Sequence, residues 1–329
     1  MKKYTTILFL LLSVGLSAQR STNLPLNDDS HRIYDRLEIL NGDMRNNHAS
    51  LKPMTRKAVR QYADSIVSES YWQKNKRRAF EYQYLKNDHN DEDTSVHSNR
   101  TFMKFLYPRK NKSFLRHFYK TPAHLLEFRT SKFYVNINPI IHFKGAYERF
   151  NGSDNLVFYN RRGLKIRGNI AEKVYFYTDI IETQADYPQY VQQRIIDDFA
   201  VPGGGYFKQY DSNLSAAKDT AGVDYLLAEG YISVDLLKNH IGLQLGHGRH
   251  FIGDGHRSLF LSDYSTNYFY LKLNTRVWKI NYQNIFAQLT QNYGQKYRAF
   301  DLALPKKYLA AHHLSINILK NLNIGLFEG

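Results

Sequence analysis

The sequence predicts a mainly β protein: an antiparallel transmembrane β-barrel, open and incomplete in this chain, preceded by a small helical region on the periplasmic side. From residue 132 onward, apolar and polar residues alternate with a period of two, which is typical of strands that have one face in an apolar environment. The connections between these strands alternate between long and short, as in outer-membrane barrels with short periplasmic turns and long external loops. Alternation alone does not distinguish a lipid-facing sheet from one that covers a core, so a soluble all-β fold stays open as an alternative.

Residues 1–18 have the features of a secretory signal peptide. Lys2 and Lys3 precede an apolar run over 7–16, and Ser17-Ala18-Gln19 follows, so we expect cleavage after Ala18. A retained signal anchor is the alternative, but the run is shorter than the roughly 20 residues that a spanning helix needs. The mature chain is therefore expected to be exported to the cell outer membrane.

Residues 19–131 predict a helical periplasmic region with connectors. Apolar residues recur at helical spacing over 32–40 and 53–66, and a third candidate helix covers 71–86. In the second segment Pro53 suits the first helical turn. One stripe of this segment collects Met54, Ala58, Val59, Tyr62, Ala63 and Ile66.

Residues 132–329 predict the strands of the barrel. The expected strands are 132–143, 162–170, 173–183, 223–236, 240–246, 267–274, 276–289, 308–319 and a further one that begins at 322. The apolar set expected to face lipid includes Ile232, Val234, Leu243, Phe269 and Leu271, whereas Glu229 and Ser233 face inward. A change of apolar face between Tyr282 and Ile285 predicts a β-bulge.

The connections set the expected topology. The long ones are 144–161, 184–222, 247–266 and 290–307, and the short ones are 171–172, 237–239, 274–275 and 320–321. We expect the long loops outside the cell, and the short turns together with the N-terminal region in the periplasm.

Eight complete strands and a ninth that starts at Leu322 do not predict a closed barrel. Bacterial single-chain barrels have an even number of strands, and closure is what removes sheet edges. The polar face also carries bulky Tyr, Lys, Arg, Glu and Asp residues, which need a wider interior than eight strands enclose. We expect an open, curved half-barrel with unpaired edges at 132–143 and near 322–329, and a natural protein that continues with further strands after Gly329.

Composition narrows the classes of function. The absence of cysteine excludes disulfides, thiolate metal sites and cysteine nucleophiles. In a cytosolic protein, the formal charge of +15 would suggest that nucleic acid is the partner. Because this chain is expected to be exported, we expect an anionic surface polysaccharide or lipopolysaccharide as its partner, and no nucleic acid. A solvated basic surface without a dedicated partner is the plain alternative. No Gly-x-Ser-x-Gly, phosphate-binding loop or His-Glu-x-x-His pattern occurs, so we expect no enzyme.

Two of the long loops carry candidate ligand-binding residues. Exposed tyrosine beside polar residues suits sugar rings, and charged groups suit sugar hydroxyls or acidic sugars. These criteria select, as a polysaccharide site, Arg249, Asp254, His256 and Arg257 in 247–266 and Tyr187 and Tyr190 in 184–222. The alternatives are internal salt bridges and ordinary loop aromatics.

The same loop contains four residues that are chemically suited to bind Zn or Cu: His247, His250, Asp254 and His256. Their spacing matches no compact metal signature, so we expect no metal and no cofactor.

Several motifs resemble one family. These are 33–40 (IYDRLEIL), 52–57 (KPMTRK), 203–206 (GGGY) and above all 246–263 (GHGRHFIGDGHRSLFLSD). They are similar to the Wzi-type capsule-assembly outer-membrane proteins, most of all to the branch that takes part in gliding motility. The resemblance covers nearly all of the mature chain and implies a non-enzymatic, lectin-like barrel that holds exopolysaccharide at the cell surface, or a surface accessory of gliding. It also implies contacts with outer-membrane lipid and with other motility or capsule-export proteins. Members are longer than this chain.

Two other functions remain as alternatives at this point. The first is a porin-like channel or transporter, and the second is a soluble secreted enzyme that processes carbohydrate. A plug formed by 247–266 would favour the lectin-like function, and an open pore would favour the channel.

Overall fold

The computed structural model describes residues 21–45, 47–67, 75–89, 124–150, 153–211, 221–237, 240–290 and 305–329. The strands of the large sheet are β2 (Leu126–Arg129), β3 (Phe133–Phe150), β4 (Ser153–Ile170), β5 (Val174–Asp186), β6 (Lys208–Asp211), β7 (Ala221–Leu237), β8 (Ile241–Gly248), β10 (Tyr268–Val277), β11 (Ile280–Thr290), β12 (Lys306–Leu319) and β13 (Leu322–Glu328). A two-stranded sheet is formed by β1 (Leu51–Lys52) and β9 (Phe251–Ile252). The helices are α2 (Asp29–Asn41), α3 (Arg56–Val67), α5 (Lys76–Asp88) and α7 (Gln189–Asp198).

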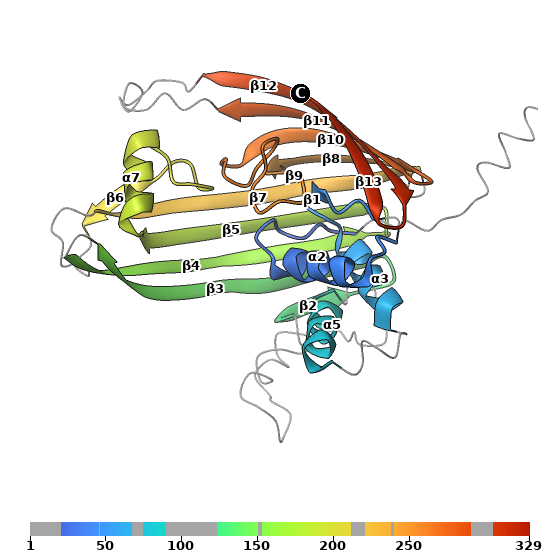
Figure 1. Cartoon of the computed structure of the whole chain (residues 1–329), viewed down its shortest axis with the longest axis horizontal. Coiled ribbons are helices and arrows are strands. Elements are labelled where there is room, and N and C mark those ends of the chain that lie inside the picture. The colour runs from blue at the N-terminus through green and yellow to red at the C-terminus, as the bar shows by residue number, and fades with distance from the viewer. Residues whose placement is uncertain are drawn as a thin grey trace, which may run out of the picture.

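The eleven-stranded sheet is antiparallel and open (Figure 1). Its order is β13-β12-β11-β10-β8-β7-β5-β4-β3-β2, with β6 paired to β7 beside this path. The mainly β, antiparallel fold predicted from the alternation is confirmed. Within the described residues β13 pairs only with β12, so the sheet does not close on itself, as expected. The expectation of an unpaired edge at 132–143 is wrong in part, because residues 134–137 of β3 pair with β2.

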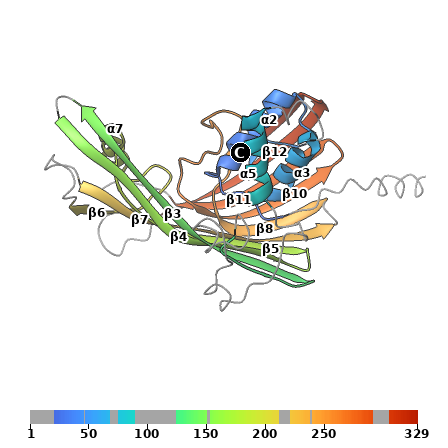
Figure 2. The ribbon, with the colours of Figure 1, turned by 90° about the horizontal axis from the view of Figure 1, so that it is seen from below.

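The two faces of the sheet are those that the sequence predicts. Along β5, odd-numbered residues from Tyr175 to Ala185 are buried, and even-numbered residues such as Ile180 are more exposed. Ile232, Phe269 and Leu271 also point outward, away from the concave face. Helices α2, α3 and α5 lie on the concave side (Figure 2). The outward face is therefore apolar and uncovered, and the inward face is mixed and covered.

The first long loop predicted, 144–161, is wrong. Strands β3 and β4 extend through it and remain paired up to Phe150 and Ser153. The pair Asn151-Gly152 stands between these two residues, and Asn-Gly is the strongest short-range hairpin signal in a sequence. The loop predicted at 184–222 also contains more structure than expected, because it includes α7 and β6. The long connection at 290–307 lies largely outside the described residues.

The turn predicted at 274–275 is four residues too early. Strands β10 and β11 pair in one unbroken register up to Val277 and Ile280, and Trp278 has a positive φ of 52° in the turn between them. The predicted bulge in 276–289 is also absent from the described pairing of β11 with both neighbours. The apolar face changes because Tyr282 and Phe286 point outward, whereas Ile285 and Ala287 point inward into a core with Tyr268 and Tyr270. The predicted turns at 171–172 and 320–321 are correct.

The three N-terminal helices share a small core of their own. The predicted stripe of the second helix is buried, with Val59, Tyr62, Ala63 and Ile66 packed against Tyr34 and Leu37 of α2. The helix starts later than predicted: Pro53 lies three residues before α3 instead of in its first turn. Asp28 caps α2 by accepting a hydrogen bond from the Ser30 backbone N–H, and Gly42 ends it with a left-handed φ of 67°. We call residues 21–67 and 75–89 the helical unit.

The helical unit docks on the inward face of the sheet. The Asn23 backbone N–H donates to the Tyr231 hydroxyl at 2.6 Å, and the His48 Nδ1 lies 2.7 Å from the Ser315 hydroxyl. The Met44 N–H donates to the Lys320 carbonyl at 2.8 Å, at the short turn between β12 and β13. The pairing of β1 with β9 joins the unit to the loop after β8. The helical unit and the short turns therefore lie at the same end of the sheet.

The strand region also begins earlier than residue 132, since β2 already belongs to the large sheet. Further contacts extend across the predicted boundary. The Arg167 guanidinium on β4 donates to the backbone carbonyl of Asp88 at 3.3 Å. The helical unit and the sheet are thus packed against each other rather than joined only by a connector.

The docking predicts a stability effect at Tyr231. Replacing Tyr231 by Phe leaves the Asn23 N–H without its acceptor, and the expected loss in the free energy of unfolding is about 1 kcal/mol or more. Urea unfolding of the folded protein measures it. Tyr206→Phe, at an exposed tyrosine, is the matched control and should leave the midpoint unchanged. Equal midpoints for the two variants would show that this contact does not hold the helical unit.

Candidate functional site

A pocket of about 600 Å³ lies between α7, the segment after β8 and the inward face of β4 and β7. Its wall is rich in tyrosine and arginine. These residues are Tyr159, Tyr187, Tyr190, Tyr225 and Tyr264, with Arg161, Arg194, Arg249 and Arg257. Asp263 is the one acidic residue among the described residues that line it. We call this the tyrosine–arginine pocket.

Neighbouring strands and α7 position the aromatic floor. Tyr159 on β4 pairs in register with Ala185, two residues before Tyr187, and the two tyrosine rings are 6.0 Å apart between centroids. The hydroxyls of Tyr187 and Tyr225 are 2.9 Å apart, so one donates to the other. Gln192 of α7 donates to the Tyr187 carbonyl at 2.6 Å and fixes the start of the helix. The rings therefore form a connected surface of the kind that stacks on sugar rings while the hydroxyls bind polar groups.

The arginines differ in how strongly they are engaged. Arg161 is half-buried on β4, with its guanidinium carbon 5.8 Å from the centre of the Tyr159 ring, and its Nε atom is buried without a hydrogen-bond partner in the described structure. Arg194 of α7 forms a salt bridge of 2.7 Å with Asp198. Arg257 is exposed and lies 3.9 Å from Asp263. Arg161 and Arg257 thus offer positive charge to a ligand in the pocket.

Arg249 has a structural task beside its place in the wall. Its side chain is buried, and Nη1 donates to the backbone carbonyls of Gly203 at 2.9 Å and Asp263 at 2.8 Å. Gly203 has a left-handed φ of 73°, which residues with a side chain rarely adopt, so glycine is favoured at this position. A buried guanidinium that satisfies two carbonyls ties the segment after α7 to the segment before β10.

The pocket brings together four of the six residues selected from the sequence. Tyr187, Tyr190, Arg249 and Arg257 line it, whereas Asp254 and His256 are exposed and lie outside its wall. Asp254 lies near the acidic side of α2. Burial, together with the nearby Asp35 and Asp254 carboxylates, raises the pKa of Glu38 to about 7. An acidic residue in that position is poorly placed to share a ligand with the pocket.

The other wall residues were missed, and the reason is local. Tyr159 and Arg161 fall in the segment that was predicted as a loop. Had the pairing of β3 with β4 up to Phe150 and Ser153 been recognised, the period of two would have placed both on the inward face with Lys165 and Arg167. Arg194 and Tyr264 had no comparable signal, because they reach the pocket through α7 and through an irregular segment.

The histidines of the 247–266 segment do not gather around a common point. His250 is buried, with Nδ1 3.1 Å from the Tyr268 hydroxyl, and the His247 Nδ1 lies 3.0 Å from the Ala228 carbonyl. Across the described ranges, no group of three or more His, Cys, Asp and Glu residues is placed to hold a metal ion.

None of the described helices is both long and apolar enough to cross a membrane. Comparison with protein-family models, with curated proteins and with solved structures finds no match to this chain.

The geometry of Arg249 predicts a loss of order in two segments. Arg249→Lys keeps the charge, but the lysine side chain ends one bond short of the Nη1 position from which both carbonyls are reached. We expect faster proteolysis within 199–207 and 253–266 of the purified protein, measured by mass spectrometry of early fragments. Arg257→Lys, at an exposed side chain, is the control. Equal cleavage rates in both variants would contradict the role of Arg249 as a tie between the segments.

Proposed function

We propose that this chain is a non-enzymatic outer-membrane protein that binds surface polysaccharide, in the attachment or assembly of capsule or exopolysaccharide or as an accessory of gliding motility. The observation that carries the proposal is the tyrosine–arginine pocket between α7, the segment after β8 and the inward face of β4 and β7. Tyrosine rings with arginines at their edges suit a carbohydrate that carries negative charge.

The outward face of the sheet supports insertion in a membrane. Large apolar side chains are exposed on strand after strand of this face, among them Ile141, Leu164, Ile180, Leu226, Ile232, Leu245, Phe269, Phe286 and Leu326. Soluble monomers rarely expose apolar patches larger than a few hundred Å². A lipid environment removes the cost of this exposure, whereas water does not. The motifs that resemble the Wzi-type proteins support the same proposal.

A porin-like channel is supported less well. The inward face carries the helical unit at one end, and the segment after β8 lies against it through Phe251 and Ile252, which are buried. A covered inward face fits a protein that binds at its surface better than one that conducts solutes. Charged inward residues such as Asp179 and Arg167 are buried here rather than arranged along a water-filled path.

Binding to immobilised polysaccharides tests the proposal on the folded, full-length protein in detergent. We expect binding to an acidic polysaccharide, and a loss of about tenfold in affinity, roughly 1.4 kcal/mol, for Tyr190→Ala. Arg161→Gln should weaken binding to the acidic polymer and leave binding to a neutral polymer of the same backbone unchanged.

Tyr308→Ala is the control, because Tyr308 is as exposed as Tyr190 but lies on β12, away from the pocket. If Tyr190→Ala and Arg161→Gln, like the control, bind the acidic polysaccharide as tightly as the natural sequence, the assignment of the pocket is contradicted. The absence of binding to every polysaccharide tried would contradict the proposed function itself.

A further inference from the structure

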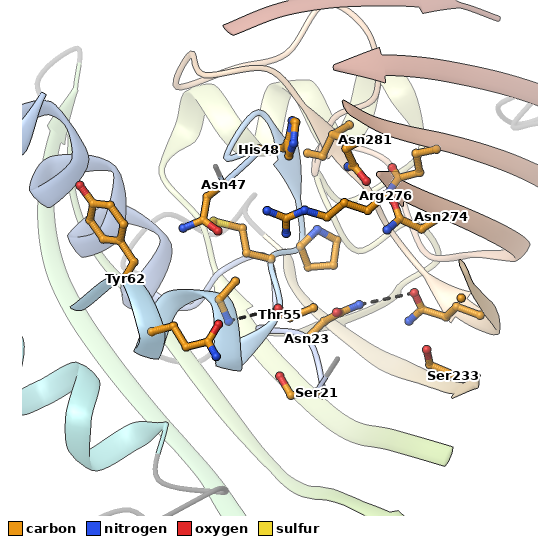
Figure 3. A pocket seen from close by; sticks show the side chains of 18 of the residues that line it. Ser21, Asn23, Asn47, His48, Thr55, Tyr62, Ser233, Asn274, Arg276 and Asn281 are labelled. Carbon is orange, nitrogen blue, oxygen red and sulfur yellow. Dashed lines mark hydrogen bonds between the residues drawn. The ribbon is translucent and has the colours of Figure 1, made fainter. Parts of the chain in front are cut away.

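A second pocket, of about 400 Å³, lies between the helical unit and the inward face of the sheet. It is separate from the tyrosine–arginine pocket and shares no lining residue with it. Its wall combines residues that precede and begin α3 with inward-facing residues of β7, β8, β10 and β11 (Figure 3). We call it the docking pocket, because the docking of the helical unit creates it.

The docking pocket has a positively charged wall. Arg45 of the helical unit and Lys272 and Arg276 of β10 line it, and no aspartate or glutamate occurs among the described residues that do so. Arg276 extends from β10 toward Asn47 of the helical unit, with His48 and Asn281 nearby (Figure 3). Like charges in a partly enclosed, low-dielectric space raise the local affinity for an anion.

Neutral polar groups complete the wall. Gln244 is 4% exposed; its Oε1 accepts from the Asn23 side chain at 3.5 Å, while its Nε2 is buried without a hydrogen-bond partner in the described structure. The Oδ1 of buried Asn281 and the Nε2 of buried His48 are likewise without partners there. Buried polar atoms are stabilised by hydrogen bonds, so a ligand with matching groups would gain three of them at this wall.

These three atoms specify more than an anion. Gln244 Nε2 is a donor, which an anionic oxygen satisfies, but Asn281 Oδ1 is an acceptor and needs a donor on the ligand, such as a hydroxyl. Burial, with the neighbouring Arg276 and His313, lowers the pKa of His48 to about 3, so its ring is neutral near pH 7. When its Nδ1 donates to Ser315, which in turn donates to Asn323 at 3.1 Å, the Nε2 of His48 is a second acceptor.

We propose that the docking pocket binds a small organic anion that also bears hydroxyl groups, of the size of one sugar ring with a carboxylate or a phosphate. Arg276, Lys272 and Arg45 bind the anionic group, and Asn281 and His48 accept from the hydroxyls. A volume of this order suits one small molecule. The inference does not rest on the polysaccharide function, since it uses neither the tyrosine–arginine pocket nor the lipid-facing surface.

Isothermal titration calorimetry on the full-length protein in detergent tests the proposal with four probes: glucuronate, glucose 6-phosphate, inorganic phosphate and glucose. We expect one or both sugar anions to bind more tightly than phosphate and glucose, and the pair to show whether a carboxylate or a phosphate is preferred. Arg276→Gln should weaken sugar-anion binding by about ten- to a hundredfold, the usual effect of losing a hydrogen bond to a charged group. Arg32→Gln, which removes the same charge at an exposed site of the helical unit, should have no effect.

Thermal melting of each variant shows whether it is folded. Two further variants test the pocket in case Arg276→Gln does not fold. Arg45→Gln at the partly exposed rim should also weaken binding, and Asn281→Leu should weaken the sugar anions while leaving phosphate unchanged. No binding of either sugar anion tighter than about 1 mM, or −4.1 kcal/mol, would overturn the proposal. Equal losses in Arg276→Gln and Arg32→Gln would overturn it as well, and phosphate that binds as tightly as the sugar anions would overturn the assigned hydroxyl contacts.

Discussion

The structure depends on the need to satisfy polar groups on the inward face of the sheet. Strand residues on this face include Asn136, Arg167, Gln244 and Ser315, all of them buried. Burying such groups without hydrogen bonds costs free energy, and charged groups cost most. The helical unit provides part of what they need: its backbone and side chains pair with Tyr231, Ser315 and Asn317 on the sheet. The sheet and the helical unit therefore specify each other.

The same constraint organises the two ends of the molecule. At the short-turn end, contacts such as that from Met44 to Lys320 bring the helical unit close to the turns and leave the docking pocket between the two layers. Toward the opposite end, α7 and the segment after β8 cover the inward face, and of the described residues of the helical unit only Asn27 reaches the pocket there. Arg249 holds these two segments together through their backbone carbonyls. Each pocket is thus a consequence of incomplete coverage of a polar face.

The sequence predicts the faces of the strands well and the ends of the strands poorly. Alternation of period two depends only on the pleat, so the outward positions of Ile232 and Phe269 follow from the residues alone. The turn after β10 was misplaced because Asn274-Thr275 has turn-forming composition, whereas the pairing runs on to Val277 and Ile280. The pockets lay beyond sequence reasoning for a different reason. Tyr159 and Tyr187, or His48 and Asn281, are distant in the chain and meet only through tertiary packing.

The central proposal is that the uncovered apolar side of the sheet faces lipid and that the other side is covered. Spin labels placed one at a time at residues 175–184 of β5, in protein reconstituted into vesicles, test it through their accessibility to oxygen and to a water-soluble nickel reagent. The account predicts alternation: even-numbered positions, with Ile180 at their centre, accessible to oxygen but not to nickel, and odd-numbered positions poorly accessible to both. Even-numbered positions that are as accessible to nickel as an exposed loop would contradict the account, because the apolar face would then lie in water.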